Sequence, residues 1–309
     1  MKPNFICIGA QKGGTTSLIK YLNYHPKIYM KQGECHFFDR PLSDGPLTKQ
    51  DIKKYENSFT TKKRIIGEKT PSYSYLKYAI DRIYNYDKNI KLIFLLREPI
   101  SRAYSQYNMT LNFNDKTLDD VTEYEMMNTF INDNCLELGE LHSKLLSHSY
   151  IQRGYYDEIL TYILSKFSRK NIYIGISEEI NKNKLKYYNE IYQFLGVKKL
   201  DRINENLNAH IRTYTKPMPK ALEHYLYTIY KSHNKKLYKL LGRKIDIWED
   251  YYNNLLGVDS VSTTKESIQH YKTNTNTTLP KSTLPKSTLP KSTLPKSTLP
   301  KSTLPKSTL

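Results

Sequence analysis

The residues that decide the fold are GAQKGGTTS at positions 9–17, which follow the short apolar run NFICI at positions 4–8. The apolar run is typical of a buried strand, and LIKYL at positions 18–22 has the spacing of a helix. This order predicts an anion site, because the free N–H groups of a first helical turn and the helix dipole both favour negative charge. The expected binding groups are Lys12, Gly13, Gly14, Thr15, Thr16 and Ser17.

The loop differs from the one that binds ATP or GTP, whose pattern is G-x-x-x-x-G-K-[ST]. Counted from Gly9, Gly14 fits that pattern, but Thr15 stands where the lysine belongs and the lysine is at position 12. This order disfavours an ordinary nucleoside triphosphatase. A plain strand-to-helix turn is the alternative, but a lysine, two glycines and three hydroxyls at one helix start favour phosphate binding.

A second basic site is expected after the apolar run KLIFLL at positions 91–96, which continues as REPISRAYS at positions 97–105. Pro99 is expected to end the strand and to begin a helix near residue 100. Arg97 at the strand end and Ser105 in the helix can then face the crevice where open α/β sheets bind ligands. A guanidinium gives two-point recognition of a phosphate. A salt-bridged arginine and a surface serine are the alternative.

Together these blocks resemble the PAPS-dependent sulfotransferases, especially the heparan-sulfate branch and its bacterial relatives. The loop is similar to the family pattern [QR]-K-x-G-T-x-x-L, and residues 97–105 are similar to R-x-P-x-x-R-A-x-S. The resemblance implies that Lys12 and the residues after it contact the 5′-phosphosulfate of PAPS. It also implies that Arg97 and Ser105 hold the 3′-phosphate. The similarity runs from about Phe5 to Trp248.

Two further segments resemble the same family. KQGECHFFD at positions 31–39 is similar to K-E-x-H-F-F-D, and GEKTPSY at positions 67–73 is similar to E-K-[ST]-P-x-Y. Sulfuryl transfer needs a base on the acceptor and positive charge around the transferring group. The resemblance implies that Glu34 is this base, that His36 orients the base or the acceptor, and that Lys69 polarises the transferring group.

Each of these side chains also has a structural alternative. Glu34 could be a loop carboxylate, and His36 could sit on an aromatic cluster. Lys69 could pair with Glu68, which is also the second candidate for the base.

The segment HIRTYTKP at positions 210–217 lies where family members place a basic loop over the donor. It lacks the usual K-G-R or G-x-x-G-x-x-K pattern, so Arg212 and Lys216 are candidates on charge alone. Elsewhere the sequence predicts a strand at residues 171–176 and a helix at residues 184–195 closed by Gly196. The apolar stripe that begins at Ala221 is expected to pack in the core, as is Trp248.

The chain has 309 residues and a net charge of +18, part of which belongs to a repeat. LPKST occurs six times at positions 279–308, and a proline every fifth residue opposes both helix and sheet. We therefore expect a disordered tail at residues 258–309. Its eight lysines against two acidic residues carry +6, which leaves +12 for a folded sulfotransferase domain at residues 1–257. The expected fold is α/β, a three-layer P-loop-like domain with a mainly parallel central sheet and helices on both faces.

Several classes of protein and location are disfavoured. No run of 18 apolar residues is present, so we expect no helical membrane span. No secretory signal is visible and the three cysteines are widely spaced, which favours a reducing, cytoplasmic location. No helix-turn-helix, zinc-finger or RNP pattern is evident, so no specific nucleic-acid partner is expected. The oligomeric state stays open.

The function expected from the resemblance is transfer of a sulfuryl group from PAPS, leaving PAP, to a hydroxyl or amine of an acceptor. A carbohydrate acceptor is favoured, and a tyrosyl peptide, a lipid or a small molecule stays open. No metal is expected, because the lysines supply the charge that magnesium brings to kinases. The alternatives are a kinase-like phosphotransferase and a non-catalytic protein that binds PAP or a polyanion.

Overall fold

The computed structural model describes residues 1–133, 148–207 and 215–257. A five-stranded, fully parallel sheet forms its centre, with the strand order β2-β3-β1-β4-β5. The strands are β1 (Phe5–Gly9), β2 (Ile28–Met30), β3 (Ile65–Lys69), β4 (Lys91–Leu96) and β5 (Ile172–Ile176). Because parallel neighbours need crossover connections, helices alternate with the strands along the chain.

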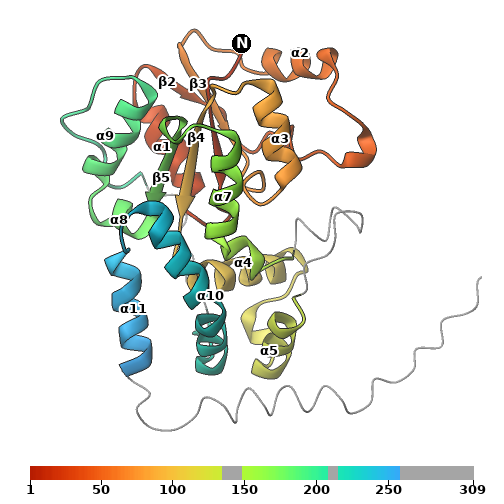
Figure 1. Cartoon of the computed structure of the whole chain (residues 1–309), viewed down its shortest axis with the longest axis vertical. Coiled ribbons are helices and arrows are strands. Elements are labelled where there is room, and N and C mark those ends of the chain that lie inside the picture. The colour runs from red at the N-terminus through yellow and green to blue at the C-terminus, as the bar shows by residue number, and fades with distance from the viewer. Residues whose placement is uncertain (134–147, 208–214, 258–309) are drawn as a thin grey trace, which may run out of the picture.

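Helices cover both faces of the sheet (Figure 1). On one face lie α1 (Thr15–Tyr24), α8 (Ser177–Lys182) and α9 (Lys184–Leu195). The other face carries α3 (Lys77–Tyr86) and α7 (Tyr156–Lys166). The remaining elements are the helices α2 (Lys49–Asn57), α4 (Pro99–Phe113), α5 (Glu123–Ile131), α10 (Lys220–Leu241) and α11 (Asp246–Gly257), and the short 3-10 turns η1 (Leu42–Asp44), η2 (Leu118–Asp120), η3 (Gln152–Gly154) and η4 (Arg169–Asn171).

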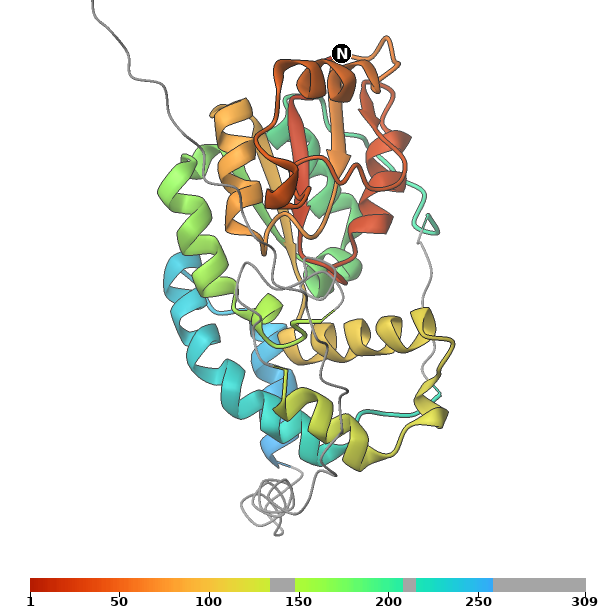
Figure 2. The same ribbon diagram turned by 90° about the vertical axis from the view of Figure 1, so that its right-hand side faces the viewer.

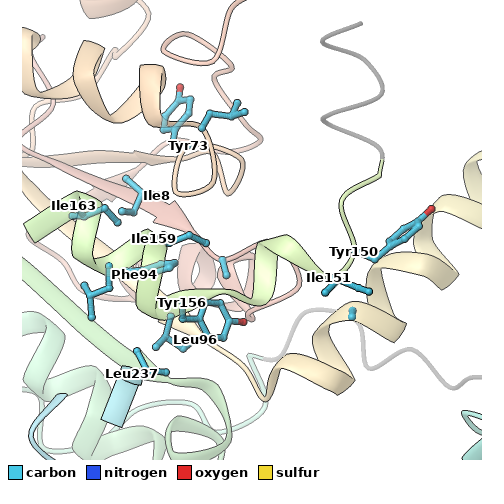
Figure 3. Close-up of a cluster of buried hydrophobic side chains, with 14 of the residues drawn as sticks. Ile8, Tyr73, Phe94, Leu96, Tyr150, Ile151, Tyr156, Ile159, Ile163 and Leu237 are labelled. Atoms are coloured by element: carbon cyan, nitrogen blue, oxygen red, sulfur yellow. The ribbon is translucent and has the colours of Figure 1, made fainter. Parts of the chain in front are cut away.

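Two hydrophobic cores result from the alternation of side chains along each strand. In β1, Ile6 and Ile8 pack into one core, and Phe5 and Cys7 pack into the other. Figure 3 shows the first core, where side chains from β1, β4 and α7 meet. All five residues of β1 are buried, which explains its continuous apolar run.

Several expectations from the sequence are confirmed in this arrangement. The helix predicted at residues 184–195 is α9, and Gly196 closes it in the left-handed conformation with φ 88°. Pro99 is the first residue of α4. The stripe in α10 is core, because Leu222, Leu226 and Tyr230 are buried there. Trp248 is fully buried in α11 and belongs to the first core.

The predicted three-layer α/β fold with a parallel sheet is therefore confirmed. The domain boundary predicted after residue 257 stays a prediction, because the described residues end there. The predicted tail at residues 258–309 lies outside the described residues. Within the described ranges, no helix is both long and apolar enough to cross a membrane.

The sheet positions a site at the carboxyl ends of its strands. β1 lies in the middle of the sheet between β3 and β4, so the segments that follow these three strands emerge side by side. α4 and α5 lie beyond this end of the sheet (Figure 2). Open α/β sheets bind ligands at this edge, and the predicted residues Lys12, Lys69 and Arg97 all belong to it.

Candidate active site

The glycine-rich loop after β1 presents the start of α1 to the site. Gly14 caps the helix with φ 82°, and no described side chain caps it. Position 13 requires glycine, because a Cβ atom there would lie only 2.6 Å from the carbonyl oxygen of Leu95. A helix start of this kind can bind a phosphate oxygen through its backbone N–H groups. Thr15 is buried, Thr16 is exposed and Ser17 is half-buried.

Lys12 lies in the same loop and connects it to the turn after β4. Its backbone is left-handed, with φ 68°, and its Nζ is 3.9 Å from the Sδ of Met109 in α4. The guanidinium of Arg97 donates to the carbonyl oxygen of Lys12 at 3.4 Å. The two predicted phosphate-binding residues therefore lie side by side, although 85 positions separate them in the sequence.

The turn that carries Arg97 is fixed from several sides. Tyr156 Oη donates to the carbonyl oxygen of Arg97 at 2.9 Å. The carboxylate of Glu98 accepts from the N–H groups of Ile100 and Ser101 and so caps α4. Ser105 is buried in the second turn of this helix. This bonding leaves the half-exposed guanidinium of Arg97 at the carboxyl edge of the sheet.

Glu34, His36 and Lys69 meet at the neighbouring strands. Lys69 is the last residue of β3 and is only 5% exposed, and its Nζ lies 2.6 Å from Oε1 of Glu34. The other carboxylate oxygen of Glu34 is 3.3 Å from Nε2 of His36. The structure thus pairs Lys69 with Glu34 and not with Glu68.

Asp39 completes this group, and the sequence reasoning assigned it no role. His36 Nδ1 lies 2.8 Å from Oδ2 of Asp39, which also accepts from the hydroxyl of Ser72 at 2.5 Å. Asp39 is 1% exposed. The signal for it was its place three residues after His36 in the quoted segment, but spacing alone does not show which ring nitrogen it faces.

The charges of this group perturb one another. Hydrogen bonds to Asp39 and to Glu34 raise the pKa of His36 to about 10, so the imidazole carries a proton at neutral pH. Burial acts to raise the pKa of Glu34, but hydrogen bonds from His36 and Lys69 outweigh it and lower that pKa. Glu34 is therefore an ionised carboxylate held between two cations, and its side chain is still 35% exposed. An accessible, oriented carboxylate of this kind can accept a proton.

Residues 2–249 match the sulfotransferase domain family. The chain belongs to the sulfotransferase family. It is 32% identical over 198 residues to human heparan sulfate glucosamine 3-O-sulfotransferase 3B1, which covers 64% of this chain and 47% of that protein. The membrane-associated sulfotransferase kil1 of Dictyostelium discoideum is 25% identical over 315 residues, covering 78% of this chain and 65% of that one. The chain thus spans about half the length of the heparan sulfate relatives it matches.

Among solved structures, a sulfotransferase from Alicyclobacillus acidocaldarius superimposes with a TM-score of 0.64. The superposition covers 81% of this chain and 99% of the Alicyclobacillus chain, and the two sequences are 23% identical. The likeness supports the shared fold. Together with the family match, it confirms the resemblance that the sequence motifs indicated.

Two further candidates, Arg212 and Lys216, belong to the basic segment at residues 210–217. Arg212 lies outside the described residues. Lys216 is exposed, and its Nζ lies 3.7 Å from the carboxylate of Asp119. Its contribution to donor binding stays a prediction.

The second candidate for the base, Glu68, has other partners than Lys69 and Glu34. Neighbouring residues on a strand point to opposite faces, so Glu68 and Lys69 project in different directions from β3. Glu68 is fully buried and accepts from the hydroxyls of Tyr55 at 3.2 Å and Thr70 at 2.9 Å. This burial favours Glu34 over Glu68 as the group that meets an acceptor.

Proposed function

We propose that this sulfotransferase transfers a sulfuryl group from PAPS to a hydroxyl or amine of a carbohydrate. The observation that carries the proposal is that two contacts lie at the carboxyl edge of the sheet: Arg97 with Lys12, and Lys69 with an ionised and accessible Glu34. A donor that is anionic at both ends matches this distribution of charge. The similarity to heparan sulfate sulfotransferases supports a carbohydrate acceptor.

The donor fits two features of the described chain. The uncapped start of α1, with Gly13 and Gly14, suits the phosphate end that carries the sulfuryl group. Arg97 suits the 3′-phosphate, because a guanidinium can bind two phosphate oxygens at once. PAPS supplies the sulfuryl group, and the chain's own residues orient it and manage the proton.

In the proposed reaction, Glu34 accepts the proton of the acceptor hydroxyl or amine. The acceptor atom forms a bond to sulfur, and the bond between sulfur and the phosphate oxygen breaks, so that PAP leaves with the electron pair. Lys12 and Lys69 offset the negative charge that builds on the leaving oxygen. When Lys69 turns toward this oxygen, Glu34 loses one of the two hydrogen bonds that lower its pKa and becomes a stronger base.

The protonated His36 fixes the orientation of Glu34. Its Nε2 faces Glu34 and its Nδ1 faces Asp39, so the ring bridges the two carboxylates. Because both contacts favour the charged imidazolium, His36 acts as a fixed donor in this arrangement. A rigid carboxylate is placed correctly without further ordering at the moment of transfer.

The test is transfer of sulfate, followed by mass spectrometry and by release of PAP, with PAPS and partly desulfated heparan sulfate oligosaccharides. We expect Glu34→Gln to bind PAP as the wild type does and to lower kcat by about 100-fold or more, in the range for loss of a general base. Glu158→Gln is the matched control, because this exposed carboxylate lies on α7.

Three results would contradict the proposal. Turnover of ATP without sulfate transfer favours a kinase-like phosphotransferase. Binding of PAP with no transfer to any glycan in the wild type indicates a non-catalytic binding protein. Full activity in Glu34→Gln removes this residue from the role of base.

A further inference from the structure

Four consecutive backbone N–H groups, those of residues 35–38, donate to side-chain hydroxyls. Thr70 Oγ1 accepts from the N–H of Cys35 at 3.1 Å and from that of His36 at 3.4 Å. Tyr73 Oη accepts from the next two N–H groups at 3.0 and 3.3 Å. Both hydroxyls belong to the segment that directly follows β3. This segment therefore holds the backbone of the chain that carries Glu34 and His36.

The hydrogen-bonding groups of these two hydroxyls have defined partners. A hydroxyl has one hydrogen to donate and two lone pairs to accept with. Two backbone N–H groups occupy the lone pairs of Thr70, and its hydrogen goes to Oε2 of Glu68 at 2.9 Å. Tyr73 also hydrogen-bonds Glu68. One carboxylate thus orients both hydroxyls so that their lone pairs face the backbone.

Glu68 is suited to this role because it is fully buried among donors. Besides Thr70 and Tyr73, it hydrogen-bonds the hydroxyl of Tyr55 in α2 and the thiol of Cys35. An ionised carboxylate has about four acceptor sites, which equals the number of these donors. A glutamine would offer half as many acceptor sites and would turn two hydrogens of its own toward them.

The segment needs such support, because its backbone is strained where the site forms. His36 has φ 46°, a left-handed conformation that residues other than glycine keep only where the surroundings hold them. Its ring must meet Glu34 and Asp39 together. The bonds from Thr70 and Tyr73 lie on both sides of the Cα of His36, at residues 35 and 36 and at residues 37 and 38.

We propose that Glu68, Thr70 and Tyr73 are positioning residues for sulfuryl transfer, which hold residues 35–38 so that Glu34 and His36 meet Lys69. The inference rests on the proposed function, since positioning has a kinetic meaning only where the reaction occurs. β3 then serves the site twice. Lys69 faces Glu34 directly, and Glu68 on the opposite face acts on the same segment through two hydroxyls.

The main test compares Thr70→Val, which removes the hydroxyl at nearly constant volume, with Thr70→Ser, which keeps it. We expect Thr70→Val to lower kcat by about tenfold to a hundredfold, because a small misplacement of a reacting group costs this much. The dissociation constant of PAP should stay within about twofold of the wild-type value, because Lys12 and Arg97 are untouched. Thr70→Ser should recover most of the lost kcat.

Thr110→Val is the matched control. The hydroxyl of this buried threonine donates to the backbone of its own helix α4 at 3.2 Å, so its loss removes a buried hydroxyl without touching residues 35–38. Equal kcat values for Thr70→Val and the wild type would overturn the inference. So would equal losses in Thr70→Val and Thr70→Ser, which would indicate packing and not the hydroxyl.

Hydrogen exchange gives a readout that does not depend on turnover. Amides 35–38 should be protected in the wild type and in Thr70→Ser, and should exchange at least about tenfold faster in Thr70→Val. Tyr73→Phe should expose amides 37 and 38 to exchange while it leaves amides 35 and 36 protected. This second variant tests the inference even if Thr70→Val does not fold. Unchanged protection in Tyr73→Phe overturns the inference. If the wild type transfers no sulfate, the proposed function fails, and the exchange pattern still decides whether these hydroxyls hold the segment.

Discussion

Replacement of Glu68 by glutamine should change how the stability of the protein depends on pH. Glu68 is fully buried, and burial raises its pKa from the ordinary 4.5 to about 7 even though its hydrogen bonds act to lower it. An acid whose pKa is higher in the folded than in the unfolded state binds more protons when folded. Protonated Glu68 therefore stabilises the folded protein at low pH. The free energy of unfolding falls as pH rises from 4.5 through 7 and this carboxyl ionises.

The size of the effect follows from that displacement of the pKa. At about 1.4 kcal/mol per pH unit, a rise from 4.5 to about 7 corresponds to about 3 kcal/mol. The wild type should lose about this much stability, relative to Glu68→Gln, between pH 4.5 and pH 8. Glutamine does not titrate, so the difference between the two proteins isolates this carboxyl from the other groups. Above pH 7 the ionised Glu68 is thus a cost to stability that the positioning of residues 35–38 would explain.

The measurement is urea denaturation of both proteins at half-unit steps of pH. The fluorescence of the single tryptophan, Trp248, is a suitable signal because this side chain is fully buried in the native state. Asp201→Asn is the control for the loss of a carboxylate charge, because this residue is exposed. If the difference in unfolding free energy between the wild type and Glu68→Gln does not change with pH, burial does not raise the pKa of Glu68. If that difference comes to favour the wild type as pH rises, the hydrogen bonds to Glu68 outweigh its burial.

Two further changes test the site itself. Gly13→Ala should weaken PAP binding by about tenfold or more, because the new Cβ would lie 2.6 Å from the carbonyl oxygen of Leu95 and would displace the loop. Calorimetry measures this affinity. An unchanged affinity would contradict the close approach of the loop to Leu95. Asp39→Asn should lower the pKa of His36, because Asp39 and Glu34 together raise that pKa to about 10. An NMR titration should then show the ring losing its proton at lower pH. An unchanged titration would mean that Asp39 does not set the charge of this ring.

The sequence by itself determined the fold class and the strand–loop–helix unit at residues 5–24. Local patterns suffice for both: the apolar runs that became β1 and β4 have the length and composition of buried strands, and the glycine-rich loop leads directly from β1 into α1. Pro99 marks the start of α4 for the same local reason, since its ring fixes φ and it lacks an N–H group. These features are decided within a few residues of one another.

Only the tertiary structure decided the arrangement around Glu34. Glu34 and Lys69 lie 35 residues apart and meet at 2.6 Å because β2 and β3 pair in parallel and bring the segments that follow them together. The same pairing brings the hydroxyls of Thr70 and Tyr73 to the backbone of residues 35–38. Glu68 and Lys69 are neighbours in sequence and both are buried, yet Lys69 contacts Glu34 whereas Glu68 accepts from the hydroxyls of Tyr55 and Thr70. Which carboxylate lies beside Lys69 is thus a property of strand pairing and burial, which residue spacing alone does not contain.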